Sequence, residues 1–292
     1  MKVIKGAPIA KRIRKIVIED MKEFFRFVPN PQLNVLLVGN EPSSRWYAGA
    51  KVKLGKMLGI TVNVIEYREE VETGDLIALI NNWNTDSAVN GIIIELPLPA
   101  KIDDEILMMA IDPIKDVDGV TAVNRALLLG GNIDKAILPA TPLACIEIAK
   151  EVVPNFIGKR VVVVGRGYTV GRPLASLLLT EHATVTVCHI ETRNLSDFTK
   201  NADIIISAAG VVNLVNKDNI KEGVIIVDVG INRIVDETAP RGYRIVGDCD
   251  YKNIKDMCNA ITPVPGGVGP MTIAMLLENV LHAYKHINKI YI

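Results

Sequence analysis

Short apolar runs alternate with segments of helical periodicity along most of this 292-residue chain. In the first half, residues 33–38, 61–67 and 91–96 are predicted strands, and residues 45–58 and 75–83 are the predicted helices between them. Parallel strands need a long crossover connection, so this order favours an α/β fold in which helices cover parallel sheets. The alternation returns in the second half, with strands and helices predicted at 143–152, 159–164, 172–179, 184–188, 204–207 and 224–229.

The alternation of strands and helices stops after Asn132. A domain boundary is predicted near residues 136–142, where Pro139 and Pro142 interrupt regular secondary structure. The first domain is expected to comprise residues 1–138, beginning with an amphipathic helix over residues 1–27. A last apolar-periodic helix over 273–287, with Thr272 as its N-cap, is expected to return to this domain as residues 272–292. Residues 139–271 would form the second domain.

Composition excludes several classes of protein. Thirty-three basic and 33 acidic residues balance, which argues against a nucleic-acid groove, and no apolar run is long enough to span a bilayer. The four cysteines are scattered, as are the four histidines, so no metal site is predicted. Unpaired thiols are typical of a reducing compartment, and a cytoplasmic protein is expected.

A glycine-rich turn follows the predicted strand 159–164. Gly165 and Gly167 would allow a tight turn close to a pyrophosphate, and Gly171 would allow the next helix to pack on the strand. The spacing is one residue longer than the commonest dinucleotide fingerprint, but a strand precedes it and a helix follows it. A dinucleotide site is favoured over an empty strand–helix turn.

The tip of the next strand, which contains His189, should lie near the adenosine ribose. Glu191 follows Gly171 by twenty residues, where an acid often binds the ribose hydroxyls of NAD. Arg166 and Arg193 could instead neutralise the 2′-phosphate of NADP. Two predicted strands end in small residues, at 207–210 and 228–232. The backbone there could contact the nicotinamide and its ribose, or these could be ordinary strand ends.

Residues 262–272 hold three glycines among three prolines, directly before the last predicted helix. Glycine permits close backbone approach and proline stiffens the chain. The segment is predicted to be a rigid loop whose amides face an anionic or polar ligand from a helix N-terminus, the alternative being an elaborate surface turn.

Three further segments of the first domain carry reactive groups. Tyr47 and Lys51 are four residues apart and should share a helical face. Residues 91–99 read as a buried strand that ends in two prolines, and residues 115–119 place two carboxylates in a turn. Taken alone, a tyrosine and a lysine at this spacing are usually a solvated surface pair.

Together these segments resemble the bifunctional methylenetetrahydrofolate dehydrogenase/methenyltetrahydrofolate cyclohydrolases, in the family's order and across nearly the whole chain. The matching segments are 38–51, 91–99, 115–119, 165–173, 228–232 and 262–272. The resemblance implies oxidation of 5,10-methylenetetrahydrofolate by hydride transfer to NADP, followed by hydrolysis of the methenyl product to 10-formyltetrahydrofolate. It also implies a homodimer and a role in tetrahydrofolate interconversion and purine biosynthesis.

The resemblance implies residue roles as well. Tyr47 would stack on the folate, Lys51 would be the general catalyst of the cyclohydrolase step, and Asp118 would hydrogen-bond the pterin. Other positions would bind substrate or cofactor. Those expected to line the folate site are Glu95, Leu96, Pro265 and Gly266, and those expected to hold the cofactor are Gly165, Arg166, Gly167, Gly171, His189, Ile231 and Thr272.

This sequence departs from the family pattern near the cofactor. Gly167 replaces a serine, Ile190 another serine, and Glu191 a basic residue, while Arg166 is kept. Ala140 replaces a frequent cysteine. NADP is still expected, with NAD as the alternative.

Glu95 stands where the family has a glutamine that contacts the catalytic lysine. An ionised Glu95 would hold Lys51 protonated, whereas a base must be free of its proton. The substitution predicts a cyclohydrolase that is weakened or shifted in pH relative to the dehydrogenase. The alternative is that Glu95 turns away from Lys51 and has no effect.

Two other functions stay open. Glu95 and Glu191 favour a monofunctional NAD-dependent dehydrogenase with weak cyclohydrolase activity. A non-catalytic dinucleotide sensor is the other, although it would not need Tyr47, Lys51 and Asp118 together.

Overall fold

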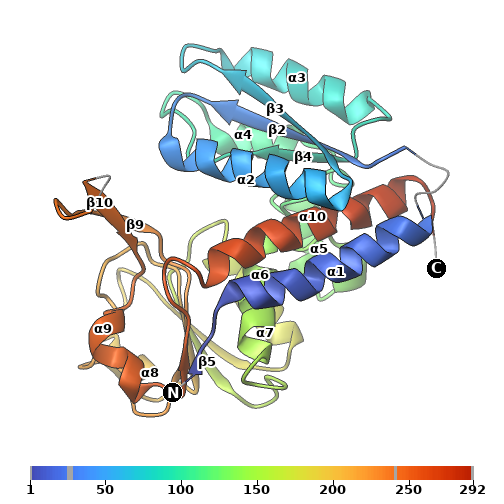
Figure 1. The fold of residues 1–292 in the computed structure, drawn as a ribbon. Helices are drawn as coiled ribbons and strands as arrows, with labels where there is room; N and C mark the ends of the chain where they lie inside the picture. Colours follow the sequence, from blue (N-terminus) through green and yellow to red (C-terminus); the bar gives the residue numbers. More distant parts are fainter. Residues whose placement is uncertain (1, 25–28, 240–241, 291–292) are drawn as a thin grey trace. The chain divides into compact units, whose positions relative to one another are not determined.

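The computed structural model describes residues 2–24, 29–239 and 242–290. The chain forms two compact units, one of residues 12–140 with 273–292 and the other of residues 1–11 with 141–272. We name them the three-stranded unit and the six-stranded unit, after the main sheet that each contains in the described part of the chain (Figure 1).

The first eleven residues differ from the sequence expectation, which placed them in the first domain. β1 (Lys2–Val3) pairs in parallel with β11 (Ala260–Ile261) and so joins the sheet of the six-stranded unit. The Ile4 amide extends the pairing by donating to the Ile261 carbonyl at 2.9 Å. A strand of two residues leaves no periodicity in the sequence to predict it.

The three-stranded unit contains a parallel sheet of order β3-β2-β4. Its central strand is buried along almost its full length, which explains the unbroken apolar run. Right-handed crossovers put α2 and α3 on opposite faces, because the chain passes from β2 outward to β3 and then back to β4 (Figure 1). The elements are β2 (Gln32–Val38), α2 (Pro42–Leu58), β3 (Thr61–Tyr67), α3 (Thr73–Thr85), β4 (Gly91–Ile94), α4 (Asp104–Ala110), α5 (Ala122–Leu129) and η1 (Ile133–Lys135).

The six-stranded unit contains a wholly parallel sheet of order β1-β11-β8-β7-β5-β6. The chain moves outward from β5 to β6 and then returns past β5 to β7, so the strand order reverses between β5 and β7. Ligands of doubly wound sheets bind at such a reversal, outside the carboxyl ends of the strands. The elements are α6 (Ala140–Lys150), β5 (Arg160–Val164), α7 (Gly171–Thr180), β6 (Thr184–Cys188), α8 (Ser196–Thr199), β7 (Ile204–Ser207), β8 (Ile225–Asp228), α9 (Tyr251–Ile254) and η2 (Lys255–Met257).

An antiparallel pair, β9 (Asn232–Val235) and β10 (Tyr243–Val246), follows β8. The Arg233 guanidinium carbon lies 3.9 Å from the ring centroid of Tyr243 across this pair. The hairpin was not predicted, because its short strands alternate weakly and carry no two-residue turn signature.

Two long helices complete the fold, α1 (Gly6–Phe24) and α10 (Val268–Ile287). Residues 1 and 25–27 of the helix predicted over 1–27 lie outside the described residues. Within the three-stranded unit, Asn279 of α10 donates to the carbonyls of Val117 and Leu138 at 2.9 and 2.8 Å, so this helix packs where it was expected.

Thr272 is not the N-cap that the sequence predicted. α10 begins at Val268, since Gly269 and Pro270 are tolerated in the first turn of a helix, where amides have no intrahelical partner. The Thr272 hydroxyl instead bonds back to the Val268 carbonyl at 3.5 Å and meets the Thr141 hydroxyl at 3.3 Å.

Candidate active site

Helix α2 holds the first two predicted site residues on one face. Lys51 is buried, with a relative exposure of 6%, and Tyr47 is half-buried. The Lys51 ammonium nitrogen lies 6.0 Å from the centroid of the Tyr47 ring. The pair is therefore not the solvated surface pair that such a spacing usually produces.

Glu95 follows directly on β4 and points at Lys51. Its amide donates to the Leu36 carbonyl at 2.9 Å, which continues the strand pairing by one residue. Its carboxylate forms a buried ion pair with the Lys51 ammonium. The Ser44 hydroxyl, at the start of α2, donates to the Leu96 carbonyl at 2.9 Å and holds the next residue against the same helix. The alternative that Glu95 turns away is wrong.

The two carboxylates of the 115–119 turn have different surroundings. Asp116 is wholly buried and accepts hydrogen bonds from the amides of Val120 and Thr121 and from the Asn124 side chain, at 2.8–3.0 Å. These bonds hold the turn together. The neighbouring Lys115 ammonium donates to three backbone carbonyls at 2.7–2.9 Å, and is also structural.

Asp118 accepts no hydrogen bond from any residue in the described ranges. Burial raises the pKa of its carboxyl to about 7, and the positive charge of Lys51 opposes that rise, while the negative charges of Asp116 and Glu95 add to it. Burial also raises the pKa of Tyr47, with a smaller contribution from Glu95. One amine, two carboxyls and a phenol are thus grouped in one place, and the Asp118 carboxyl among them can gain or lose its proton near neutral pH.

The glycine turn of the six-stranded unit is tightly packed on one side and open on the other. Gly165 has a φ of +113°, and a Cβ there would overlap the Ala208 carbonyl. A Cβ at Gly171 would overlap the carbonyl of Gly165, whereas one at Gly167 would meet nothing within 4 Å. The open side, next to the exposed Arg166, fits the close approach of a phosphate.

The end of β6 borders this turn, since the Gly165 amide donates to the Cys188 carbonyl at 2.8 Å. His189 is half-buried, and its amide donates to the Thr192 hydroxyl at 2.8 Å. Ile190 is 94% exposed and Glu191 is exposed beside it. Both residues that depart from the family pattern are therefore accessible to a ligand.

The remaining predicted residues also lie in the six-stranded unit. Ile231 is 54% exposed between β8 and β9. Pro265 and Gly266 precede α10, and the Gly266 carbonyl accepts the Gly6 amide at 2.9 Å. The five predicted residues Tyr47, Lys51, Glu95, Leu96 and Asp118 are together in the three-stranded unit, and the other predicted positions belong to its counterpart.

Two buried aspartates at the carboxyl edge of the six-stranded sheet were missed as site residues. Asp228 ends β8, and Asp248 lies just beyond β10. The Asp228 carboxylate accepts the amides of Gly230, Asp248 and Cys249 at 2.9–3.0 Å. The Asp248 side chain accepts hydrogen bonds from residues 207–211 and from Asn232, which are distant from it in the sequence, so no local sequence pattern could have revealed it.

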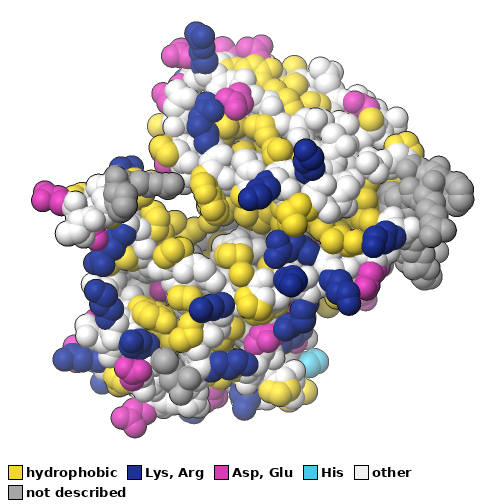
Figure 2. All heavy atoms as spheres, in the orientation of Figure 1, with side chains coloured by type: hydrophobic (Ala, Val, Ile, Leu, Met, Phe, Trp, Pro, Cys, Tyr) yellow, Lys and Arg dark blue, Asp and Glu magenta, His cyan; other side chains and the backbone are white. Residues whose placement is uncertain are grey.

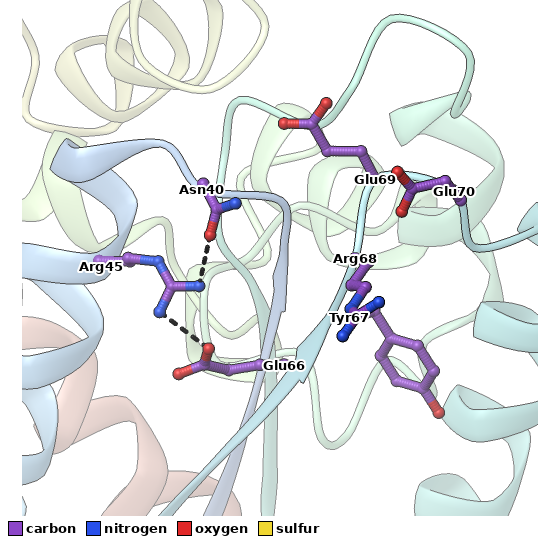
Figure 3. A pocket seen from close by; sticks show the side chains of 7 residues that line it. All are labelled: Asn40, Arg45, Glu66, Tyr67, Arg68, Glu69 and Glu70. Carbon is purple, nitrogen blue, oxygen red and sulfur yellow. Dashed lines mark hydrogen bonds and ion pairs between the residues drawn. The ribbon is translucent and has the colours of Figure 1, made fainter.

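A surface cavity of about 550 Å³ lies elsewhere on the three-stranded unit, beyond the carboxyl ends of β2 and β3 (Figure 3). Its Arg45 side chain is already bound to Glu66 at 2.8 Å and to Asn40 at 2.9 Å. The other charged side chains around it, Arg68, Glu69 and Glu70, do not converge on one point in Figure 3. It lacks the buried, mutually acting groups that surround Lys51.

Three broad features bear on other functions. None of the helices in the described part of the chain combines the length and apolar character needed to cross a membrane. Within the same ranges, no three His, Cys, Asp or Glu side chains are grouped to hold a metal ion. The chain has 33 basic and 33 acidic residues, and Lys and Arg predominate over Asp and Glu in the middle of the face shown in Figure 2.

Comparison with known proteins identifies the family. Residues 4–118 match the tetrahydrofolate dehydrogenase/cyclohydrolase catalytic domain, and residues 139–288 match the NAD(P)-binding domain of the same family. "Bifunctional protein FolD" of Chlorobium phaeobacteroides (strain DSM 266 / SMG 266 / 2430) is 41% identical over 99% of this chain and 100% of its own length. Among solved structures, the bifunctional enzyme FolD, methylenetetrahydrofolate dehydrogenase/cyclohydrolase, of Campylobacter jejuni is 42% identical, with a TM-score of 0.92 over 98% of this chain and 99% of that one.

The Trypanosoma brucei N5,N10-methylenetetrahydrofolate dehydrogenase-cyclohydrolase, solved with NADP cofactor and inhibitor, is 36% identical with a TM-score of 0.93, over 97% of each chain. Both domain models and the full-length relatives agree with the order of motifs found in the sequence. The chain belongs to the tetrahydrofolate dehydrogenase/cyclohydrolase family.

Proposed function

We propose that this chain oxidises 5,10-methylenetetrahydrofolate to 5,10-methenyltetrahydrofolate with NADP, and then hydrolyses the methenyl form to 10-formyltetrahydrofolate. The observation that carries the proposal is the buried ion pair of Lys51 and Glu95, beside Tyr47 and Asp118, in the part of the chain that matches the family's catalytic domain. The bifunctional relatives, similar over nearly their whole length, support both activities.

The three-stranded unit would bind the folate. Tyr47 offers a half-buried aromatic face for stacking, and Asp118, whose pKa is raised by burial to about 7, can present a protonated or an ionised oxygen to the pterin. Leu96 is held at the same place by Ser44. Pro265 and Gly266, which were also predicted to line the folate site, belong to the six-stranded unit.

The six-stranded unit would bind the dinucleotide, which supplies the hydride acceptor. Gly165 and Gly167 would receive the pyrophosphate, Gly171 would let α7 pack closely on the turn, and Ile231 and Thr272 would contact the cofactor further along. At the end of β6, His189 would lie near the adenosine ribose and Arg166 near the 2′-phosphate. Glu191, exposed at the same edge, weakens the preference for NADP without abolishing it.

The hydride step needs orientation of two rings rather than an acid or a base. In the hydrolytic step, water adds to the cationic methenyl carbon and one carbon–nitrogen bond breaks. One water proton is released to solvent, and the other ends on the ring nitrogen that leaves. Lys51 and Glu95 are placed to accept this proton and return it, since a hydrogen bond already joins them. The protein is unchanged at the end of the cycle.

An ionised Glu95 stabilises the ammonium form of Lys51 and so opposes its use as a base. We infer that the cyclohydrolase of this chain is weaker, or active at higher pH, than one with an uncharged residue at this position. The contact between the two side chains supports this inference.

The same proposal includes a cytoplasmic homodimer. The apolar side chain of Val235 in the six-stranded unit, which is 85% exposed, supports self-association. Light scattering at micromolar concentration tests it, and a monomer at every concentration would contradict this part.

Two assays on the purified protein test the reactions. Tetrahydrofolate, formaldehyde and NADP should produce reduced cofactor, and methenyltetrahydrofolate should be consumed faster than in buffer alone. Reduction of NAD alone, with no hydrolysis, would indicate the monofunctional dehydrogenase. Binding of a dinucleotide without turnover of any folate would indicate the sensor, which Lys51 and Asp118 disfavour.

A further inference from the structure

Asp248 is the most densely hydrogen-bonded side chain in the six-stranded unit, and the proposed reaction does not use it directly. One carboxylate oxygen accepts the Ser207 hydroxyl at 3.1 Å and the amides of Ala209 and Gly210 at 2.7 and 3.2 Å. The other accepts the Val211 amide and the Asn232 side-chain nitrogen, both at 3.0 Å. The side chain is wholly buried, so these donors replace its hydration.

Three of these donors are consecutive amides of one loop. Residues 209–211 follow β7 and turn their N–H groups inward onto the carboxylate, with Gly210 at a φ of +69°. A loop without such an anchor would depend on water for those amides and would sample several conformations. Asp248 therefore fixes the shape of this loop.

The loop lies beside the glycine turn. The Ala208 carbonyl is packed so closely on Gly165 that a Cβ there would overlap it. β5 and β7 are neighbours in the sheet, and the strand order reverses between them. The anchored loop and the glycine turn are thus the two sides of the crevice in which a doubly wound sheet binds its ligand.

A second carboxylate ties Asp248 to the next strand. Asp228, at the end of β8, accepts the amides of Asp248 and Cys249, and its own amide donates to the Thr262 hydroxyl at 2.7 Å. The segments that follow β7, β8 and β11 are consequently joined through the buried side chains of Asp248, Asp228 and Thr262. Only glycine fits around them, because a Cβ at Gly230 or Gly247 would overlap a carboxylate oxygen of Asp248 or Asp228.

We propose that Asp248 is a positioning residue for the nicotinamide half of the dinucleotide. The inference rests on the proposed function, in which the glycine turn receives the pyrophosphate and the end of β6 lies near the adenosine ribose. The nicotinamide then extends in the opposite direction, across the reversal point, to the ends of β7 and β8. Asp248 holds the loops at both of those ends.

The test compares two hydrogen-bonded aspartates of the six-stranded unit, Asp248 and Asp203. In Asp248→Asn, the new amide group faces donors where the carboxylate accepted hydrogen bonds, so the 208–211 loop must move. In Asp203→Asn, a carboxylate that accepts the Arg160 amide at 2.9 Å and the Lys221 ammonium at 3.2 Å is changed at the amino edge of the sheet. Both variants lose hydrogen bonds to a carboxylate, but only Asp248 lies beside the proposed cofactor crevice.

Calorimetric titration with NADP alone is the primary readout. Binding should weaken by about tenfold or more in Asp248→Asn and by less than about twofold in Asp203→Asn. The KM for NADP should rise in the same variant, while hydrolysis of methenyltetrahydrofolate keeps the wild-type rate, because Lys51 and Glu95 belong to the other unit.

Unchanged NADP affinity in a folded Asp248→Asn protein would overturn the proposal, and so would an equal loss of both activities. If Asp248→Asn does not fold, Ser207→Ala decides, since it removes one donor of five and should weaken NADP binding by about two- to fivefold. Wild-type protein that neither binds nor reduces NADP would instead reject the proposed function.

Discussion

The carboxylates near the two proposed ligand sites, one in each unit, are held in different ways. In the six-stranded unit, Asp228 and Asp248 are surrounded by N–H and O–H donors that satisfy them. In the three-stranded unit, Asp118 has no hydrogen-bond donor within the described ranges, and Glu95 is bound to the Lys51 ammonium. A carboxylate held by amides is a structural anchor, whereas one held only by other ionisable groups can exchange protons.

The pKa is raised for a buried carboxyl in each unit, but different groups oppose the rise. Burial raises the pKa of Asp228, but hydrogen bonds from the amides of Asp248 and Cys249 pull it down. Burial raises the pKa of Asp118 to about 7, and no amide opposes it. Burial alone therefore does not mark a catalytic acid; the kind of partner does.

The largest expected effect comes from removing the amine of the three-stranded unit. Lys51→Met keeps the length of the side chain and should lower the hydrolysis of methenyltetrahydrofolate by about a thousandfold, since proton transfer by a positioned group contributes ~10²–10⁴. Reduction of NADP should keep most of its rate. Lys53→Met, an exposed position on the same helix, is the matched control. If Lys51→Met lost hydrolysis and NADP reduction to the same extent, Lys51 would have no specific role in proton transfer.

The second prediction concerns stability against pH. The folded-state pKa of Asp118 is about 7, raised from 3.8, so the unfolded chain ionises first as pH rises. The wild type should therefore lose stability relative to Asp118→Asn between about pH 4 and pH 7. The loss should be at most ~4 kcal/mol, because a pKa difference of one between the folded and unfolded chain corresponds to about 1.36 kcal/mol. Urea unfolding of both proteins across this range measures the difference. A constant difference would show that Asp118 is no more perturbed than a surface carboxylate.

Replacing the anion beside Lys51 should have a smaller effect. Glu95→Gln removes the charge that stabilises the ammonium, so the rising limb of the cyclohydrolase pH profile should move down by about one unit or more. Glu66→Gln, which removes an exposed partner of Arg45 in the same unit, should leave the profile in place. Superimposable profiles for wild type and Glu95→Gln would refute the inference about Glu95.

The smallest effect is expected at the cofactor edge. Glu191→Lys should raise the ratio of kcat/KM for NADP to that for NAD by about five- to tenfold, because an exposed cation near a 2′-phosphate is partly screened by salt. Glu222→Lys makes the same charge change before β8, at the amino edge of the sheet, and should not alter the ratio. A ratio that moves equally in both variants would indicate a general effect of net charge.

Local sequence patterns predicted much of this molecule. Unbroken apolar runs such as β2 and the strand-to-turn signal at Gly165 each depend on neighbours along the chain, and the structure has them where expected. The resemblance to a family then singled out Lys51 and Asp118. Their spacing alone would not have done so, because a lysine four residues from a tyrosine is usually exposed.

What the sequence could not predict depends on distant contacts. Asp248 obtains its donors from Ser207, residues 209–211 and Asn232, and β1 pairs with a strand more than 250 residues away. Asp116 and Asp118 look alike in a turn of five residues, yet only the first accepts the amides of Val120 and Thr121, just before α5. Only the hydrogen-bond partners seen in the structure distinguish the structural carboxylate, Asp116, from the reactive one, Asp118.

The absence of side chains at Gly230 and Gly247 limits how this family member can vary. An aspartate side chain occupies the position that a Cβ would take at each glycine. A substitution at position 247 therefore requires a change at position 228 as well. An alanine at 247 is compatible only with a shorter residue at 228, and the two changes together should cost less stability than the sum of the single ones. Laboratory evolution that selects for NAD or NADP use should therefore accumulate substitutions at the exposed residues after β6. Single substitutions at positions 228, 230, 247 and 248 should be rejected.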